Sequence, residues 1–179
     1  MKTYSKLTII NNINKIKTKL LTTLFLLLSF SSQANAEALK ISTKNACNFL
    51  EEFGLKAQSG WKKTSESQWG CSHSQNPVNI NNANFSFFAT GQANEVKNIE
   101  IKAQVVDKKY LRLVQKKLVD ISLALTNKLV DSSITGKISE AINNNQNFSF
   151  QNENSIVDFV IIEKTDTKPL TMTIKINSK

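Results

Sequence analysis

The chain has 179 residues, a formal net charge of +9 and 40% hydrophobic side chains, which fits one globular domain with a core of its own. Five of the 23 basic residues lie in residues 1–36, where there is no acidic residue, so residues 37–179 carry 18 basic and 14 acidic side chains. Arg112 is the only arginine. Because arginine makes the bidentate contacts to bases and phosphates, this composition argues against specific nucleic-acid recognition.

Residues 1–36 have the features of a secretory signal peptide. Five lysines come before an apolar run at residues 20–30, and a small-x-small site ends at Ala36. The apolar run has 11 residues, whereas a helix that spans a bilayer needs about 20. We therefore predict cleavage between Ala36 and Glu37, no transmembrane helix in residues 37–179, and a bacterial protein exported to the periplasm or the exterior.

The first helix of the exported domain is predicted to begin at Ser42 or Thr43, either of which can serve as the N-cap. Gly54, followed by an apolar residue, is typical of the C-terminal end of a helix. Between these ends the apolar residues fall on one helical face. They are Ala46, Phe49, Leu50 and Phe53.

Two cysteines, Cys47 and Cys71, remain after the predicted cleavage. In an oxidising compartment such a pair normally forms a disulfide, which here would tie the first helix to the strand after Trp69. A structural zinc site is not expected, because the two cysteines and the single histidine, His73, are one ligand short. A catalytic Cys71–His73 pair stays open as an alternative, since residues two apart share one face of a strand.

Strands are predicted around Trp69, at residues 85–90 and at residues 96–106, and the asparagine-rich residues 76–84 are predicted as a loop. In the third of these strands apolar and polar residues alternate, which indicates one buried and one solvated face. The inward residues are Ile99, Ile101, Ala103 and Val105. Glu100 and Lys102 lie on the solvated face and are candidate binding residues.

The longest helix is predicted to begin after Asp107 and to end near Val130. Its apolar residues repeat at three- and four-residue steps, so they form one stripe that packs on the sheet. They are Leu111, Val114, Leu118, Ile121, Leu125 and Leu129. The polar side of this helix carries five basic residues: Lys108, Lys109, Arg112, Lys116 and Lys117. These residues form either a solvated helix face or a docking patch for an acidic partner or membrane surface.

A short helix at residues 135–143 and three strands at residues 148–151, 156–164 and 170–177 complete the prediction. The last strand alternates cleanly, with its apolar residues facing inward. The order of elements predicts an α+β domain in which an antiparallel sheet is packed by one long and two short helices.

A short sequence repeat suggests a duplication within this fold. Residues 81–87 read NNANFSF and residues 144–150 read NNQNFSF. Each copy comes after a predicted helix and before an alternating strand. Two interpretations stay open: a duplicated helix-plus-strands unit, or chance in an asparagine-rich chain.

The sequence contains no recognisable catalytic motif. There is no glycine-rich phosphate loop, no Gly-x-Ser-x-Gly turn and no His-Glu-x-x-His helix. With one histidine, no two-histidine metal site can form. We therefore expect no catalytic residue, no metal and no cofactor.

Three interpretations of function follow. The sequence favours a non-enzymatic domain that binds another exported protein, such as an inhibitor, immunity factor or accessory subunit. The first alternative is an envelope-associated structural protein whose lysine-rich helix contacts anionic polymer or lipid. The second is a small hydrolase that uses His73 with Cys71 or a nearby serine.

Overall fold

The structure, a computed structural model, describes residues 39–80, 83–163, 165 and 169–179, with the backbone alone at residues 74–80. The predicted signal peptide and its cleavage position between Ala36 and Glu37 therefore lie outside the described residues.

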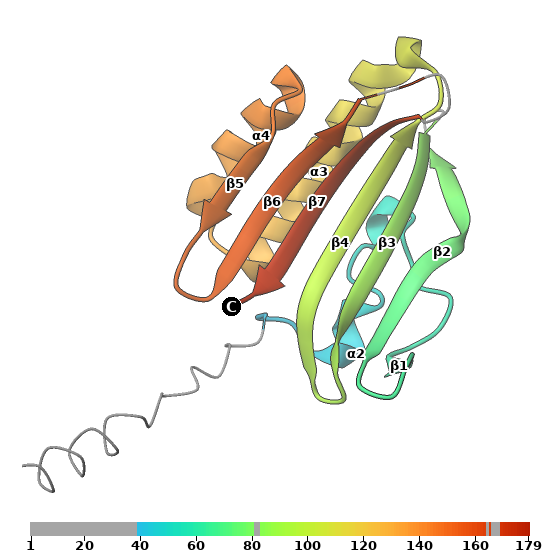
Figure 1. Cartoon of the computed structure of the whole chain (residues 1–179), viewed down its shortest axis with the longest axis vertical. Helices are drawn as coiled ribbons and strands as arrows, with labels where there is room; N and C mark the ends of the chain where they lie inside the picture. Colours follow the sequence, from blue (N-terminus) through green and yellow to red (C-terminus); the bar gives the residue numbers. More distant parts are fainter. Residues whose placement is uncertain (1–38, 81–82, 164, 166–168) are drawn as a thin grey trace, which may run out of the picture. The chain divides into compact units, whose positions relative to one another are not determined.

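The described residues form one antiparallel sheet of seven strands (Figure 1). The strands are β1 Lys62–Lys63, β2 Trp69–Ile80, β3 Ala83–Gln92, β4 Glu95–Val105, β5 Phe148–Gln151, β6 Ser155–Ile162 and β7 Leu170–Ser178. Their order across the sheet is β1-β2-β3-β4-β7-β6-β5. Two three-stranded meanders, β2–β4 and β5–β7, therefore meet at the β4–β7 pair.

The helices lie on one face of this sheet, behind it in the view of Figure 1. They are α2 Thr43–Ala46, η1 Glu51–Phe53, η2 Lys108–Tyr110, α3 Leu111–Leu129, η3 Ser132–Ile134 and α4 Thr135–Asn144. This arrangement confirms the α+β class and the antiparallel sheet with one long helix.

The core lies between the sheet and the helices. Its strand residues alternate with solvated ones, and Phe85, Phe87, Ile101 and Phe159 are fully buried. The predicted stripe of α3 faces them, and its members from Val114 to Leu125 are fully buried as well. Each such side chain contributes about 1.5–3 kcal/mol relative to an exposed one.

The long helix begins as predicted. The Asp107 carboxylate accepts a hydrogen bond from the backbone N–H of Lys109, at 3.0 Å, and η2 continues directly into α3. Gln115 was not part of the predicted stripe, yet it is buried. Its Nε2 donates to the carbonyl of Ile142 at 2.6 Å and to Oδ1 of Asn145 at 3.2 Å. This side chain therefore ties α3 to the C-terminal end of α4.

The first helix is shorter than predicted. Ser42 is its N-cap, because its Oγ accepts from the backbone N–H of Asn45 at 3.3 Å, but α2 ends at Ala46. A tighter turn follows, in which the N–H of Asn48 donates to the carbonyl of Asn45 at 3.1 Å. Asn45 and Asn48 both have low helix propensity, which favours an early end of the helix. Gly54, with φ of 79°, ends η1 as the prediction expected of a C-terminal glycine.

The prediction of a loop at residues 76–84 was wrong for the part that the structure describes. β2 continues to Ile80 and β3 begins at Ala83, and these two residues pair across the hairpin. The register of β2 shifts between His73 and Val78, so the strand is irregular there. Pairing with the well-packed β3 outweighs the low strand propensity of asparagine.

The two copies of the short repeat occupy different positions within the two meanders. Residues 83–87 of the first copy begin β3, the middle strand of its meander, and the second copy leads into β5, the first strand of its meander. The repeat therefore does not superimpose one meander on the other, and duplication stays a hypothesis.

Candidate functional site

The sheet face opposite the helices is not covered by any element among the described residues (Figure 1). We call this surface the open face. It is formed by the outward side chains of β2 to β7, which alternate with the core residues. The pairing registers place these side chains in rows across the strands.

A charged row crosses the middle of the open face. Asp158 of β6, Lys175 of β7 and Glu100 of β4 are neighbours in register. The Glu100 carboxylate lies 3.3 Å from Nζ of Lys102 and 3.6 Å from Nζ of Lys175. Ser149 Oγ donates to Oδ1 of Asp158 at 2.7 Å. The two acidic and two basic groups therefore balance in charge, and the predicted candidates Glu100 and Lys102 are adjacent.

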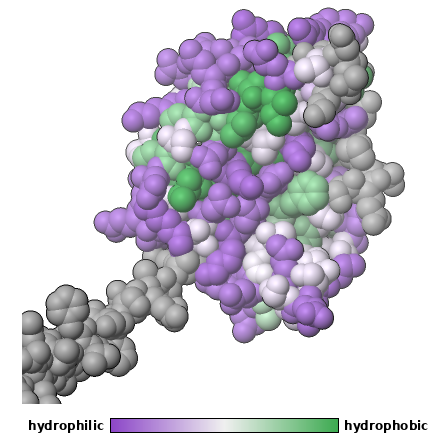
Figure 2. All heavy atoms as spheres, in the orientation of Figure 1, coloured by the Kyte–Doolittle hydropathy of each residue, from purple (hydrophilic) through white to green (hydrophobic). Residues whose placement is uncertain are grey.

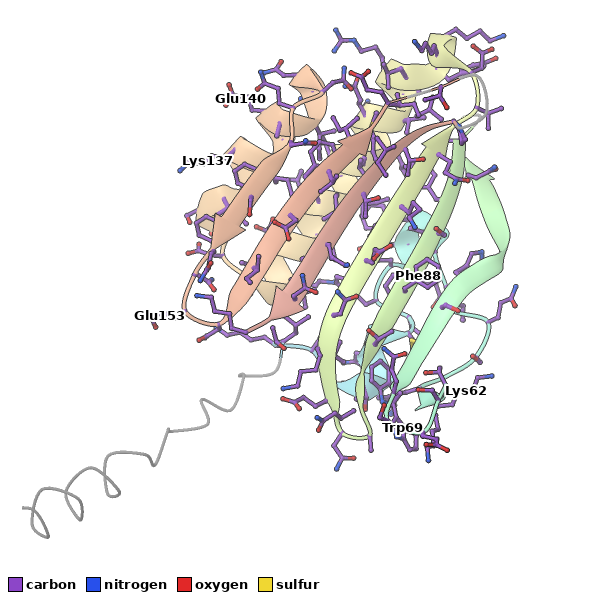
Figure 3. All side chains as sticks on the ribbon, viewed as in Figure 1. Lys62, Trp69, Phe88, Lys137, Glu140 and Glu153 are labelled. Carbon is purple, nitrogen blue, oxygen red and sulfur yellow. A yellow bond between two sulfur atoms is a disulfide. The ribbon has the colours of Figure 1, made fainter. Side chains whose placement is uncertain are left out.

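An aromatic side chain continues this row. Phe88 of β3 pairs with Glu100 on one side and with Ser72 on the other, and it is partly exposed. It borders a hollow of about 170 Å³ between β1 and β3, to which Lys62 and Gly70 also contribute. Figure 3 shows Lys62 and Phe88 on this side of the sheet. The hollow has the volume for one side chain of a partner.

A second apolar area lies across the charged row, on β6. Val160 and Ile162 are 43% and 54% exposed, although both are large aliphatic side chains. Thr173 and Thr171 of β7 are their neighbours in register. Figure 2 shows this apolar area as green surface near one end of the face, surrounded by hydrophilic side chains.

The basic residues of the long helix are on the other side of the molecule. Lys109 of η2 and Arg112 and Lys116 of α3 are exposed, and the buried stripe of α3 packs against the covered face of the sheet. Arg112 Nη1 donates to the carbonyl of Asn143 at 3.5 Å. The structure therefore separates the predicted binding residues into two sets, one on the open face and one on the helix layer.

Besides Arg112, two more of the five basic side chains have local partners. The Asp107 carboxylate lies 3.2 Å from Nζ of Lys109, and its hydrogen bond and negative charge raise the pKa of this lysine. Lys117 Nζ lies 4.9 Å from the centre of the Phe53 ring. Lys108 is exposed and lines a hollow of about 310 Å³ that Glu163 also borders.

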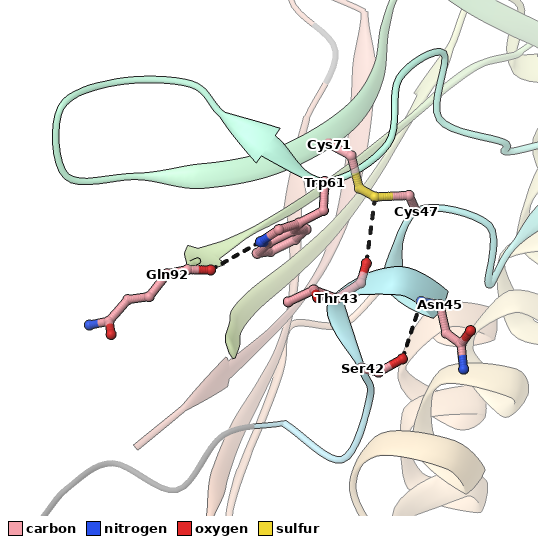
Figure 4. The surroundings of a disulfide bond; sticks show 7 residues. All are labelled: Ser42, Thr43, Asn45, Cys47, Trp61, Cys71 and Gln92. Carbon is pink, nitrogen blue, oxygen red and sulfur yellow. Dashed lines mark hydrogen bonds between the residues drawn. A yellow bond between two sulfur atoms is a disulfide. The ribbon is translucent and has the colours of Figure 1, made fainter. Parts of the chain in front are cut away.

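The predicted disulfide between Cys47 and Cys71 is confirmed (Figure 4). It joins the end of α2 to β2, with the two Cα atoms 5.7 Å apart. In this state Cys71 has no thiolate to offer as a nucleophile. His73 Nδ1 hydrogen-bonds to the carbonyl of Lys56, and its Nε2 is buried without a partner among the described residues. The Cys71–His73 pair is therefore not arranged for nucleophilic catalysis.

Trp61 lies beside this disulfide and has a structural role. Its Nε1 donates to the carbonyl of Gln92 at 3.0 Å, which ties the segment before β1 to the end of β3 (Figure 4). Its ring packs on the core from the side and is partly buried.

Two further findings concern the described residues alone. They contain no group of three or more His, Cys, Asp or Glu side chains that could hold a metal ion. Nor do they contain a helix with both the length and the apolar composition that crossing a bilayer requires.

Comparison with known proteins identifies no relative. No protein-family model, curated protein or solved structure matches the chain.

Sequence reasoning missed the apolar part of the open face. Phe88 follows Phe85 and Phe87, and the alternation that sends those two inward sends Phe88 outward. The same parity places Val160 outward, next to the buried Phe159. The sequence does place an apolar residue at an outward position in each of these two strands. In β6, however, the apolar run is continuous, so the sequence alone does not distinguish its inward from its outward residues.

Proposed function

We propose that this domain binds another exported protein, without catalysis, through the open face of its sheet. The observation that carries the proposal is the one-sided construction of the fold: every described helix packs on one face, and the other face presents apolar side chains to solvent. Exposed apolar patches rimmed by polar groups are typical of protein interfaces.

The size of the open face fits such an interface. Its five long strands, about 4.8 Å apart and about 30 Å long, give a surface of roughly 700 Å². A standard protein–protein interface buries about 800 Å² on each partner. The partner would therefore cover most of this face.

The distribution of side chains also fits an interface. Phe88 beside its hollow is suited to act as an aromatic anchor, and such anchors carry much of the binding energy. Val160 and Ile162 supply a second apolar contact on the other side of the charged row. The row itself, from Asp158 to Glu100, is balanced in charge and can orient polar groups of a partner.

These features, together with the predicted export, support an inhibitor, immunity factor or accessory subunit as the class of protein. An inhibitor, immunity factor or accessory subunit needs a stable, recognisable surface and no catalytic groups. The Cys47–Cys71 disulfide is compatible with an oxidising compartment. Because the open face is nearly neutral, the affinity for its partner should change little with salt.

The test is affinity capture from the organism's own exported proteins. Phe88→Ala and the pair Val160→Ser with Ile162→Ser should each reduce the captured partner by at least about tenfold, because hot-spot truncation costs about 2 kcal/mol or more. Lys137→Ala, on the exposed side of α4, is the control and should leave capture unchanged. Folded open-face variants that capture as well as the wild type would overturn the proposal.

A further inference from the structure

An exposed leucine on α3 is surrounded by basic side chains. Leu113 is 48% exposed, on the side of α3 that faces away from the core. Lys109 lies one helical turn before it, and Lys116 and Lys117 lie one turn after it. Arg112 is its neighbour in sequence. We call these five residues the basic patch.

The basic patch includes a residue that is unfavourable for the helix dipole. The first turn of a helix carries partial positive charge, so acidic side chains are favoured there and basic ones are not. The first turn of α3 has no acidic residue, and Asp107 precedes it as the cap of η2. Of the patch residues only Arg112 is a basic residue in this first turn, so it opposes the helix dipole, and such local conflicts are expected at functional sites.

Two lysines of the basic patch lie over aromatic rings. Lys109 Nζ lies 4.9 Å from the centre of the Tyr110 ring, and Lys117 Nζ lies 4.9 Å from that of Phe53. Each of these two ammonium groups is therefore at cation–π distance from an aromatic ring. The patch therefore combines an apolar centre with a cationic rim.

We propose that the basic patch docks on a membrane surface that contains anionic phospholipids, with Leu113 entering the boundary between headgroups and acyl chains. Charge complementarity supports this occupant, because four of the five patch residues are cationic. An apolar side chain within a cationic rim matches the layered polarity of that interface. Attachment at the surface needs no spanning helix, and the described residues contain none.

This inference goes beyond the proposed function and uses a different side of the molecule. The open face belongs to the sheet, and the basic patch belongs to the helix layer behind it (Figure 1). A protein bound on the open face would leave the basic patch free. The two surfaces together would hold a partner protein next to the membrane.

The experiment measures how protein purified from its own organism partitions onto lipid vesicles. Vesicles of phosphatidylcholine with phosphatidylglycerol should bind it, and vesicles of phosphatidylcholine alone should not. Lys116→Gln with Lys117→Gln should lower the partition coefficient by roughly 25-fold, since each basic residue near an anionic surface contributes about a factor of five. Leu113→Ala should lower it further, and high salt should abolish binding.

Matched controls separate the basic patch from the rest of the protein. Lys137→Gln removes an exposed lysine of α4, and Phe88→Ala removes an apolar side chain of the open face. Both variants should bind anionic vesicles like the wild type. Equal binding to neutral vesicles would overturn the proposal. So would an unchanged affinity of the Leu113→Ala variant combined with displacement by soluble polyglutamate, which would identify an acidic polymer as the ligand.

Discussion

The Glu100 carboxylate of β4 lies 3.6 Å from the Lys175 ammonium of β7, across the junction where the two meanders meet. Lys102, on the same strand as Glu100, contacts the other carboxylate oxygen at 3.3 Å. One acidic group thus lies between two basic ones in the middle of the open face. At the junction the outward side chains therefore interact through ion pairs, whereas the inward side chains interact through apolar packing.

This arrangement predicts the effect of exchanging the charges. Glu100→Lys would bring three lysines together, and we expect it to lower the free energy of unfolding by about 1 kcal/mol, the upper range for a surface pair. Adding Lys175→Glu should recover part of the loss. Urea unfolding of both variants at low and high salt measures the difference. If the second substitution recovers nothing, the Glu100–Lys175 contact does not stabilise the fold.

Loss of the disulfide should be costly. Cys71→Ser removes a bond that closes a loop of 24 residues in sequence separation, and we expect the free energy of unfolding to fall by about 2–5 kcal/mol. The double variant with Cys47→Ser is the control, because it removes the free thiol that the single variant leaves. Thiol titration of denatured wild-type protein should find no free cysteine, and two free thiols would contradict the bond.

Substitution by alanine should change the stability in opposite directions at two glycines. At Gly91 an added Cβ would lie 2.0 Å from the carbonyl oxygen of Glu95, which is backbone and cannot move aside. Gly91→Ala should therefore destabilise the β3–β4 hairpin by about 1–3 kcal/mol. At Gly136, near the start of α4, nothing lies within 4 Å, so alanine should raise stability by about 0.5–1 kcal/mol. Thermal unfolding compares the two, and equal effects would contradict this packing at Gly91.

Gln115 should be intolerant of an apolar replacement. Gln115→Leu keeps the volume but removes the donor to the carbonyl of Ile142 and to Asn145. The Ile142 carbonyl keeps a long bond from the backbone N–H of Asn145, at 3.4 Å, and the substitution also removes Gln115 Oε1, which is buried without a partner among the described residues. We therefore expect a loss of about 0.5–1.5 kcal/mol, the net value of one hydrogen bond. Ser122→Ala is the control, because the Ser122 hydroxyl bonds only within its own helix, to the carbonyl of Val119. Chemical unfolding should show the larger loss for Gln115→Leu, and the reverse order would contradict the α3–α4 tie.

The export prediction has its own test. The protein recovered from outside the cytoplasm should begin at Glu37, since the small-x-small site ends at Ala36. N-terminal sequencing gives the answer directly. Extracytoplasmic protein that still begins with Met1 would contradict cleavage.

Local patterns were enough to predict most elements of the fold. The three- and four-residue spacing from Val114 to Leu125 predicted α3, and the alternation from Ile99 to Val105 predicted β4, because each period reflects which side meets the core. The long strand through residues 76–80 was missed because its pairing with β3, rather than its own asparagine-rich sequence, determines it.

The candidate site depends on contacts that are distant in sequence. No local pattern shows that Lys175 lies beside Glu100, because strand order is set by how whole meanders pack. The basic residues of α3 were visible in the sequence, but their separation from Glu100 and Lys102 was not. It follows from which face of the sheet the helices cover.

The place of β7 in the sheet affects how the protein can form. β7 is next to β4 at the centre of the sheet, yet it follows every other strand along the chain. β4 therefore has no strand to pair with on one side until β7 has been synthesised, some 70 residues later in the chain. Such non-local pairing slows folding. Slow folding keeps a chain unfolded for longer, which would suit the export that the sequence predicts.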